Sequence, residues 1–279
     1  MRLIADSGST KTTWCILDLN RGKTEFLKTR GINPYYQDHN TIIKTLKEDF
    51  ESSQRQFDAI YFYGAGCANP EINKTAREAL SCFFRANRIE ITSDLMAAAH
   101  ALCGEEEGIA CILGTGSNSC YYDGATITAN VSPLGFILGD EGSGAVIGKK
   151  LLADILKKQL PQEIIELFFN TYKTDAAEIL HHIYKKPFPN RYAAGFTHFI
   201  SEHISYPSLR QLVKTSFNEF LERNVRQYEK AQHLPIHFVG SIAWHFNEIL
   251  KESLIENNLK PGKIIKDPMP ELIEYHSKH

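Results

Sequence analysis

Two stretches of this chain share one layout, in which an apolar strand leads into a small polar turn, a second strand, a tight turn and a third strand. The first stretch has expected strands at 3–5, 13–17 and 25–28 and its polar turn at 6–12. The second stretch has expected strands at 109–113, 119–122 and 125–129 and its polar turn at 114–118. Both polar turns consist of small residues and hydroxyl groups, whose amides and hydroxyls can converge on an anion. The repeat predicts two phosphate-gripping loops, an arrangement that suits a nucleotide held between two domains.

The composition is that of an ordinary globular protein, with 43% hydrophobic and 23% charged residues in 279. A net charge of -2 gives no general attraction to nucleic acid or to an anionic membrane. No apolar run approaches the ~20 residues that span a bilayer. The six cysteines form no Cys-x-x-Cys, and the N-terminus enters a strand with no leader pattern. We therefore expect a cytoplasmic protein that binds a small molecule, and not nucleic acid or membrane.

Strands alternate with helices in both halves, which predicts an α/β protein with two related domains. The charged segment at 104–108 is the expected boundary, giving domains 1–107 and 108–279, with a helical insertion in the second and a terminal helix free to pack on the first. We expect helices near 40–54, 70–86, from 93 to 102 and from 241 to 250, and strands at 57–63, 89–92, 235–239 and 263–266.

The first polar turn, DSGSTKT, can bind phosphate through Gly8, Ser9, Thr10, Lys11 and Thr12. Gly8 permits a tight turn, and Lys11 can neutralise phosphate charge. Asp6 lies at the strand end, where a carboxylate could hold Mg²⁺ through water. The alternative is an ordinary polar hairpin turn. The segment is no Walker loop, because the glycine that such a loop requires is replaced by Leu17.

The second polar turn offers Gly114, Thr115 and Gly116 to a phosphate. It is no dinucleotide fingerprint, because Ser119 stands at the third glycine position and a strand follows instead of a helix. A plain turn is again the alternative. The expected βα turn at Gly240 and Ser241 would allow close approach to an adenosine, or it simply connects a strand to a helix.

Three further positions carry groups suited to a sugar. Asp94, after a strand, is either a helix cap or a general base that accepts the proton of an attacking hydroxyl, and the two roles can coexist. Asp140 and Glu141, between glycines, can accept paired hydrogen bonds from vicinal hydroxyls, or they belong to a charged loop before the helix at 143. Asn33 can bring an amide to a ligand or start the next helix.

The order of these elements resembles the actin, hexokinase and Hsp70 superfamily, specifically the N-acetylglucosamine kinase and BadF/BadG/BcrA/BcrD ATPase-like family. The resemblance spans essentially the whole chain, through 6–12, Asp94, 114–118, GDEGSG at 139–144 and 239–243. It implies two ribonuclease-H-like (actin-like ATPase) domains with an interdomain cleft. It also implies an ATP-dependent sugar kinase, most simply one that phosphorylates the 6-hydroxyl of N-acetylglucosamine.

By this resemblance Asp94 is the catalytic base, Asp6 helps to hold Mg²⁺, and the two turns surround the phosphates of ATP. The positions that match the amino-sugar site are Asn33, Ser117, Asn118 and Asp140. One departure is Ser7, where family members commonly have glycine, and it is expected to add a small side chain beside the phosphates.

Two alternatives to a kinase remain open. One is a partner-coupled ATPase, like the dehydratase activators of this family, which hold an iron–sulfur cluster with interface cysteines; the scattered cysteines here argue against it. The other is a non-catalytic sugar or nucleotide sensor. Related repressors carry a DNA-binding segment, for which we expect no room before residue 3. The sequence is compatible with a homodimer.

Overall fold

The computed structural model describes residues 1–8, 11–50, 55–67 and 69–278. The chain forms two compact units, Met1–Glu105 with Pro268–His279, and Glu106–Asp267. The last helix is thus part of the first unit, whereas the sequence placed 108–279 in one domain and left the packing of this helix open. Each unit is described by itself below.

The first unit contains one sheet and four helices among its described residues. In chain order they are β1 (Arg2–Ser7), β2 (Lys11–Asp18), β3 (Lys23–Arg30), α1 (His39–Asp49), β4 (Gln56–Gly64), α2 (Pro70–Phe83), β5 (Arg85–Ser93), α3 (Asp94–Cys103) and α13 (Met269–Lys278). The sheet order is β3-β2-β1-β4-β5. β1, β2 and β3 form an antiparallel meander, while β4 and β5 run parallel to β1.

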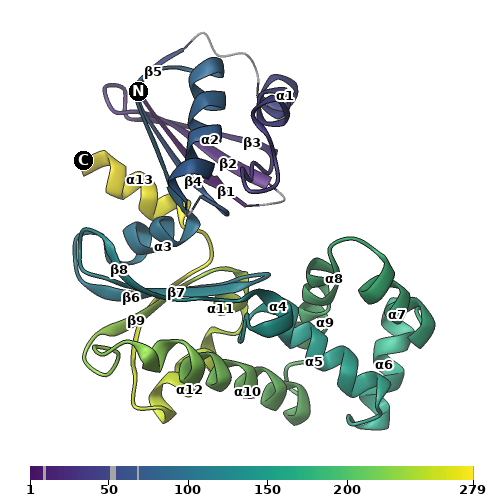
Figure 1. Cartoon of the computed structure of the whole chain (residues 1–279). Helices are drawn as coiled ribbons and strands as arrows, with labels where there is room; N and C mark the ends of the chain where they lie inside the picture. The colour runs from purple at the N-terminus through teal and green to yellow at the C-terminus, as the bar shows by residue number, and fades with distance from the viewer. Residues whose placement is uncertain (9–10, 51–54, 68, 279) are drawn as a thin grey trace. The chain divides into compact units, whose positions relative to one another are not determined.

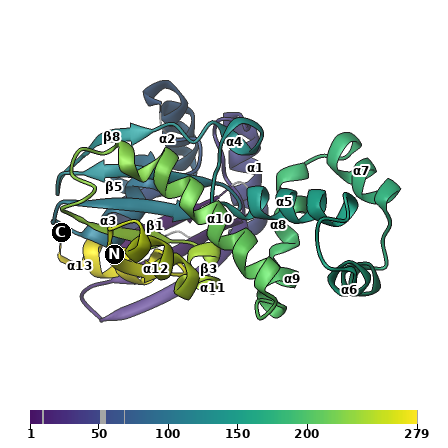
Figure 2. The ribbon, with the colours of Figure 1, turned by 90° about the horizontal axis from the view of Figure 1, so that it is seen from below.

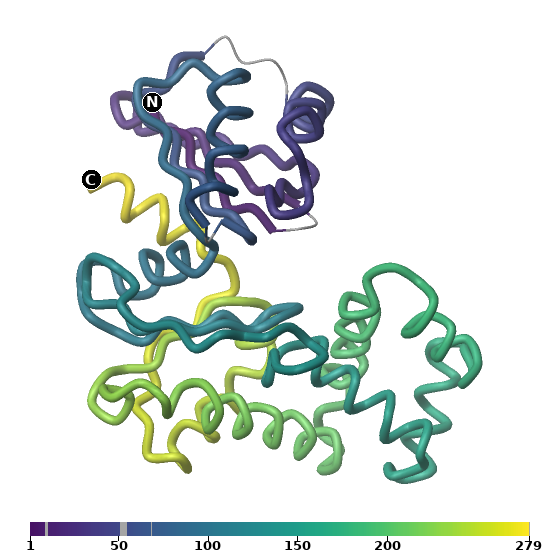
Figure 3. The backbone as a smooth tube through the Cα atoms, in the orientation of Figure 1, coloured from purple at the N-terminus to yellow at the C-terminus, as the bar shows by residue number. Residues whose placement is uncertain are grey.

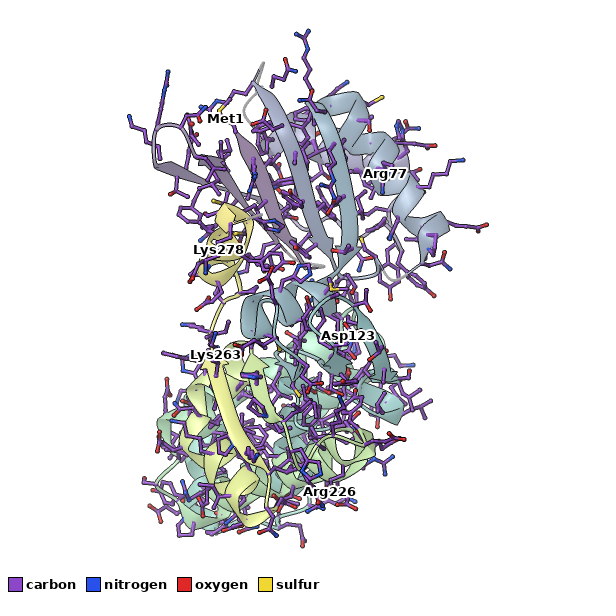
Figure 4. The ribbon with its side chains drawn as sticks, turned by 90° about the vertical axis from the view of Figure 1, so that its left-hand side faces the viewer. Met1, Arg77, Asp123, Arg226, Lys263 and Lys278 are labelled. Carbon is purple, nitrogen blue, oxygen red and sulfur yellow. The ribbon has the colours of Figure 1, made fainter. Side chains whose placement is uncertain are left out.

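Alternate residues of the strands divide the first unit into three layers. Leu3 and Ala5 of β1 join Trp14 in the core beneath α1 and α2. On the opposite face, Tyr61 of β4 stacks on His276 of α13 with ring centroids 3.8 Å apart. Successive side chains of a strand point to opposite faces of the sheet, so a sheet that is covered on both faces can bury neighbouring residues of one strand. Figure 4 shows side chains filling the space on both sides of this sheet, with Lys278 near the end of α13.

The second unit repeats the same sheet order with additional helices. Its elements are β6 (Gly108–Leu113), β7 (Ser117–Tyr122), β8 (Ile127–Val131), α4 (Gly135–Leu138), α5 (Gly144–Leu156), α6 (Gln162–Tyr172), α7 (Ala176–Lys185), α8 (Pro189–Gly195), α9 (Thr197–Glu202), α10 (Pro207–Arg223), the 3₁₀ turn η1 (Val225–Gln227), β9 (Pro235–Val239), α11 (Ser241–His245), α12 (Asn247–Glu256) and β10 (Lys260–Ile265). The order β10-β9-β6-β7-β8 mirrors that of the first sheet.

The helices of the second unit fall into two groups. α10 and α12 lie along one face of the sheet, where Phe220 and Leu250 join the core around Phe238 (Figures 1 and 2). α6 to α9 lie to the side of the sheet beyond α5 (Figure 3). They pack around their own aromatic residues, Phe168 and Phe199 among them, whose ring centroids are 5.3 Å apart. The largely helical segment expected between 143 and 233 is confirmed.

Several elements differ from their expected bounds. β5 begins at Arg85, so the helix expected at 70–86 ends earlier, at Phe83. The third strand of the second meander begins at Ile127, because the Asp123 carboxylate accepts hydrogen bonds from the backbone N–H groups of residues 125 and 126 and extends the turn. The helix expected from 241 to 250 is interrupted at Phe246, and the Asn247 amide there donates to the Trp244 carbonyl. β10 starts earlier than expected and contains an irregularity between Pro261 and Ile264.

No helix within the described ranges is long and apolar enough to cross a membrane. The expected α/β class is confirmed for both units. Within each unit, the meander and the parallel strands that follow it bring the predicted polar turn to the carboxyl edge of the sheet, where ligands of open α/β sheets bind.

Candidate functional site

The predicted residues of the first unit gather at one edge of its sheet. Ser7 pairs with Gly64, and Gly64 pairs with Ser93, so β1, β4 and β5 end in line. Asp6 precedes this line by one residue, Gly8 follows it, and Asp94 comes directly after it. β3 also ends here, because Arg30 pairs with Lys11 at the start of β2. Asn33 follows β3 closely along the chain.

The first polar turn is held from its inner side by two buried hydroxyl groups. The Gly8 backbone N–H donates to the Lys11 carbonyl over 3.0 Å. Ser7 Oγ lies 2.6 Å from Thr12 Oγ1 and donates to the Ile32 carbonyl over 2.8 Å. The Ile32 backbone N–H donates back to Ser7 Oγ over 3.1 Å. The two hydroxyls therefore tie the hairpin to the segment that leads to Asn33.

Ser7 and Thr12 are both fully buried, and the Ser7 side chain points into the unit. The Thr12 hydroxyl likewise bonds inside the fold. Phosphate binding at Thr12 stays a prediction. Lys11 is exposed. Ser9 and Thr10, the other predicted phosphate ligands of this turn, lie outside the described residues.

The Asn33 side chain is buried and shapes its own loop. Its Oδ1 accepts a hydrogen bond from the Tyr35 backbone N–H over 3.0 Å, and its own backbone N–H donates to Gln37 Oε1. Gly66 lies so close that a Cβ there would be 2.4 Å from Asn33 Oδ1, at a φ of +83°. In the sequence, Gly64 and Gly66 follow an expected strand, but this pattern does not indicate that Gly66 contacts Asn33.

Asp94 begins α3, directly after the helix cap Ser93, whose hydroxyl accepts from the Met96 backbone N–H. Asp94 Oδ1 accepts from the Leu95 backbone N–H over 2.9 Å. Burial raises the pKa of the Asp94 carboxyl, while that hydrogen bond acts in the opposite direction. A carboxylate with a raised pKa at a strand end is suited to accept a proton.

Cys67 is a neighbour of Asp94 that sequence reasoning missed. Burial, with the Asp94 charge as a second cause, raises the pKa of the Cys67 thiol to about 12. A Cβ on Gly64 would lie 2.7 Å from Cys67 Sγ, so this thiol packs closely against the end of β4. A protonated thiol adds little polarity to the surroundings of Asp94.

The donor set for a metal ion at this edge is sparse. Within the described ranges, no three His, Cys, Asp or Glu residues are grouped as a metal site. Asp6 is a single, partly buried carboxylate at the strand end. One carboxylate is nevertheless compatible with Mg²⁺, which keeps several waters and takes its remaining ligands from the phosphates of a nucleotide.

The second polar turn is held by backbone groups. The Gly114 N–H donates to the Gly116 carbonyl over 2.9 Å. At the start of α5, the Gly144 N–H donates to the Gly114 carbonyl over 2.8 Å and the Ala145 N–H to the Thr115 carbonyl over 3.0 Å. The helix that follows the GDEGSG loop therefore fixes the second polar turn. The turn and this loop lie together, which the predicted site requires.

Asp140 lies against the second turn. Its Oδ1 accepts from the Ser117 backbone N–H over 3.2 Å, and a Cβ on Gly116 would lie 3.2 Å from its Oδ2. Burial raises the pKa of the Asp140 carboxyl; the Ser117 hydrogen bond and the Lys149 charge lower it, and the Glu141 charge raises it further. Glu141 points elsewhere, because its carboxylate pairs with Arg223.

The two remaining predicted sugar ligands lie on β7. Ser117 is buried at its start. Asn118 Oδ1 accepts from the Ser119 backbone N–H over 2.9 Å and from Asn130 Nδ2 over 3.0 Å. The side-chain oxygen of Asn118 is therefore engaged within the sheet. Asp140 is the acid that the fold brings to the second polar turn.

The predicted adenosine turn meets the end of β6. Gly240 has a φ of +126°, and a Cβ there would lie 2.3 Å from the Leu113 carbonyl oxygen. Only glycine fits such a close approach of two backbones. Ser241, the first residue of α11, is exposed. Gly240 and Gly114 thus occupy adjacent positions at the carboxyl edge of the second sheet.

Comparison with solved structures identifies the family. A candidate N-acetylglucosamine kinase from Porphyromonas gingivalis is 47% identical to the chain, with a TM-score of 0.94 over 100% of this chain and 99% of that one. The chain belongs to the N-acetylglucosamine kinase and BadF/BadG/BcrA/BcrD ATPase-like family. This confirms the resemblance found from the sequence. No protein-family model matches the chain, and no curated protein matches it either.

Two less similar structures share the fold with this chain. A candidate N-acetylglucosamine kinase from Chromobacterium violaceum is 16% identical, with a TM-score of 0.74 over 98% of both chains. An MreB protein of Spiroplasma citri bound to AMPPNP is 10% identical, with a TM-score of 0.59 over 99% of this chain and 95% of that one. The actin-like ATPase fold predicted for this family member is therefore confirmed.

Proposed function

We propose that this protein is an ATP-dependent sugar kinase that transfers the γ-phosphoryl group of Mg·ATP to the 6-hydroxyl of N-acetylglucosamine, with Asp94 as the general base. The relative from Porphyromonas gingivalis supports the sugar-kinase class. The observation that carries the proposal is the register of the first sheet, which puts Asp94 and the turn at Gly8 on one edge.

Phosphoryl transfer requires alignment and charge neutralisation more than covalent help from the protein. In the proposed reaction Asp94 accepts the proton of the sugar hydroxyl as its oxygen attacks the γ-phosphorus, and ADP leaves. Lys11 and the backbone N–H groups of the two turns offset phosphate charge. Mg²⁺, when bound beside Asp6, would neutralise the β- and γ-phosphate oxygens. Asp140 accepts hydrogen bonds from sugar hydroxyls.

The raised pKa of Asp94 fits this role. A general base works best when its pKa lies near the working pH, and burial moves the Asp94 pKa in that direction. The position of Asp94 at the start of α3 keeps the carboxylate in one orientation through the Leu95 N–H. Asp94 therefore acts both as a helix-terminal acid and as the proposed base.

The experiment that tests the proposal measures ADP release from Mg·ATP with a panel of hexoses and N-acetylated amino sugars. Release that depends on N-acetylglucosamine, with the 6-phosphate as product, is the expected result. ADP release that no sugar stimulates would instead indicate a partner-coupled ATPase. Nucleotide or sugar binding without any turnover would indicate a sensor. Either of these results would overturn the kinase assignment.

A further inference from the structure

The loop that carries Asp140 has an unusual backbone. Asp140 has a φ of +56° and Gly142 a φ of +73°. A Cβ on Gly139 would lie 2.2 Å from the Pro133 carbonyl oxygen. A left-handed conformation is unfavourable at a residue that has a side chain, such as Asp140, and it persists only when neighbouring structure enforces it. The contacts that enforce this loop therefore matter for the position of Asp140.

The end of α10 supplies contacts to the residue that follows Asp140. Arg223 Nε lies 2.5 Å from Glu141 Oε1, and Asn224 Nδ2 lies 3.4 Å from Glu141 Oε2. The Glu141 side chain is 15% exposed and Asn224 is buried. A Cβ on Gly142 would lie 2.9 Å from the Phe220 Cβ, so the loop also rests directly on α10.

Asp140 and Glu141 consequently face different partners. Asp140 contacts Gly116 and Ser117 in the second turn, whereas Glu141 contacts the end of α10. The sequence predicted that both acids bind the sugar. The structure engages the Glu141 carboxylate within the unit, so its two oxygens are occupied by the guanidinium and the amide.

We propose that Arg223 and Asn224 are positioning residues that hold Glu141 and thereby keep Asp140 against the second turn. The inference rests on the proposed function, in which Asp140 binds the sugar. Without Arg223, the partly buried Glu141 charge loses its main partner and is drawn toward water. The loop then shifts, and Asp140 leaves the position from which it accepts sugar hydroxyls. Because the phosphate turns are held by other bonds, nucleotide binding changes little.

Steady-state kinetics of Arg223→Met measure this directly. We expect the KM for the sugar to rise about tenfold, with the KM for ATP within about twofold of wild type, as displacement of one binding group predicts. Arg223→Lys, which retains the charge, recovers part of the loss. The matched control is Arg226→Met, because Arg226 lies just beyond the same helix end but contacts Glu222 and Asn257 instead of the loop. If Arg223→Met and Arg226→Met behave alike, the proposal is wrong.

A double substitution separates positioning from a general loss of stability. If Arg223 acts through Glu141, Glu141→Gln in the Arg223→Met background adds little to the rise in sugar KM. Additive effects would contradict the proposed path.

Hydrogen–deuterium exchange of the unliganded protein separates this proposal from the assignment of function. We expect faster exchange at 133–145 in Arg223→Met than in wild type or Arg226→Met. If exchange is faster in Arg223→Met but the wild-type protein phosphorylates no sugar, the positioning role is retained and the kinase function is overturned. Unchanged exchange at 133–145 would overturn the positioning role even if the kinase assay succeeds.

Discussion

The two units have the same sheet order but hold their polar turns in different ways. In the first unit, the side-chain hydroxyls of Ser7 and Thr12 bind the backbone around Ile32. In the second unit, backbone N–H groups at the start of α5 bind the carbonyls of Gly114 and Thr115. Equivalent topology therefore fixes where each turn lies, while local chemistry decides how it is held. Side-chain substitutions should weaken the first turn, and added backbone bulk should weaken the second.

The largest expected effect on stability is at Gly240. Gly240→Ala introduces a Cβ against the Leu113 carbonyl at a φ of +126°, so the end of β6 must move. We expect a loss of at least about 3 kcal/mol in the free energy of unfolding. Urea unfolding followed by Trp244 fluorescence in a Trp14→Phe background reports on the second unit. Gly195→Ala is the control, since a Cβ at Gly195 meets nothing within 4 Å. Equal stability of the two variants would refute the close approach.

A smaller loss is expected from the side-chain clamp of the first unit. Ser7→Ala removes the hydroxyl that bonds both backbone groups of Ile32 and should lower the free energy of unfolding by about 1–3 kcal/mol. Urea unfolding followed by Trp14 fluorescence in a Trp244→Phe background measures it.

Ser119→Ala offers the matched change in the second unit. Ser119 Oγ bonds Tyr228 Oη over 2.8 Å, and that phenol still accepts from the Val131 N–H after the substitution. We therefore expect a smaller loss than for Ser7→Ala. A larger loss for Ser119→Ala would reverse the comparison between the units.

The smallest stability effect concerns Asp94 and depends on pH. Burial raises the pKa of Asp94 in the folded state, so the native protein binds this proton more tightly than the unfolded chain. The ionised carboxylate therefore lowers stability above the folded pKa, and this effect disappears as the pH falls below the unfolded value of about 3.9. We expect Asp94→Asn to have a higher Tm than wild type at pH 7 and the same Tm near pH 3.5. A lower Tm for Asp94→Asn than for wild type at pH 7 would show that the helix dipole stabilises the Asp94 carboxylate by more than its burial costs.

Much of the fold follows from sequence pattern. Alternating apolar residues identified both meanders, and the helix expected to open at Ser93 begins at Asp94 with Ser93 as its cap. The extension of the expected turn at Asp123 and the break at Phe246 were missed, because each depends on one side chain that bonds nearby backbone. Such local competition does not alter the hydrophobic period.

The candidate site was predictable in its residue types more than in its contacts. The glycines of the two polar turns and Asp94 stand out by their position after strands, and Asp140 stands out by its position between glycines before a helix. The hydrogen bonds of Ser7 could not be read, because their partner Ile32 lies 25 residues further along the chain. Arg223 carries no local signal at all, since it meets Glu141 only when α10 packs beneath the loop.

The central claim is that Asp94 accepts the proton of a sugar hydroxyl during phosphoryl transfer. Its most direct test is the rate of N-acetylglucosamine 6-phosphate formation by Asp94→Asn in a single turnover with Mg·ATP, beside Glu71→Gln, an exposed acid in the first turn of α2, as control. We predict a rate about a thousandfold below wild type for Asp94→Asn, with ATP affinity nearly unchanged and full activity in the control. An Asp94→Asn protein that retains most of its transfer rate would contradict the assignment.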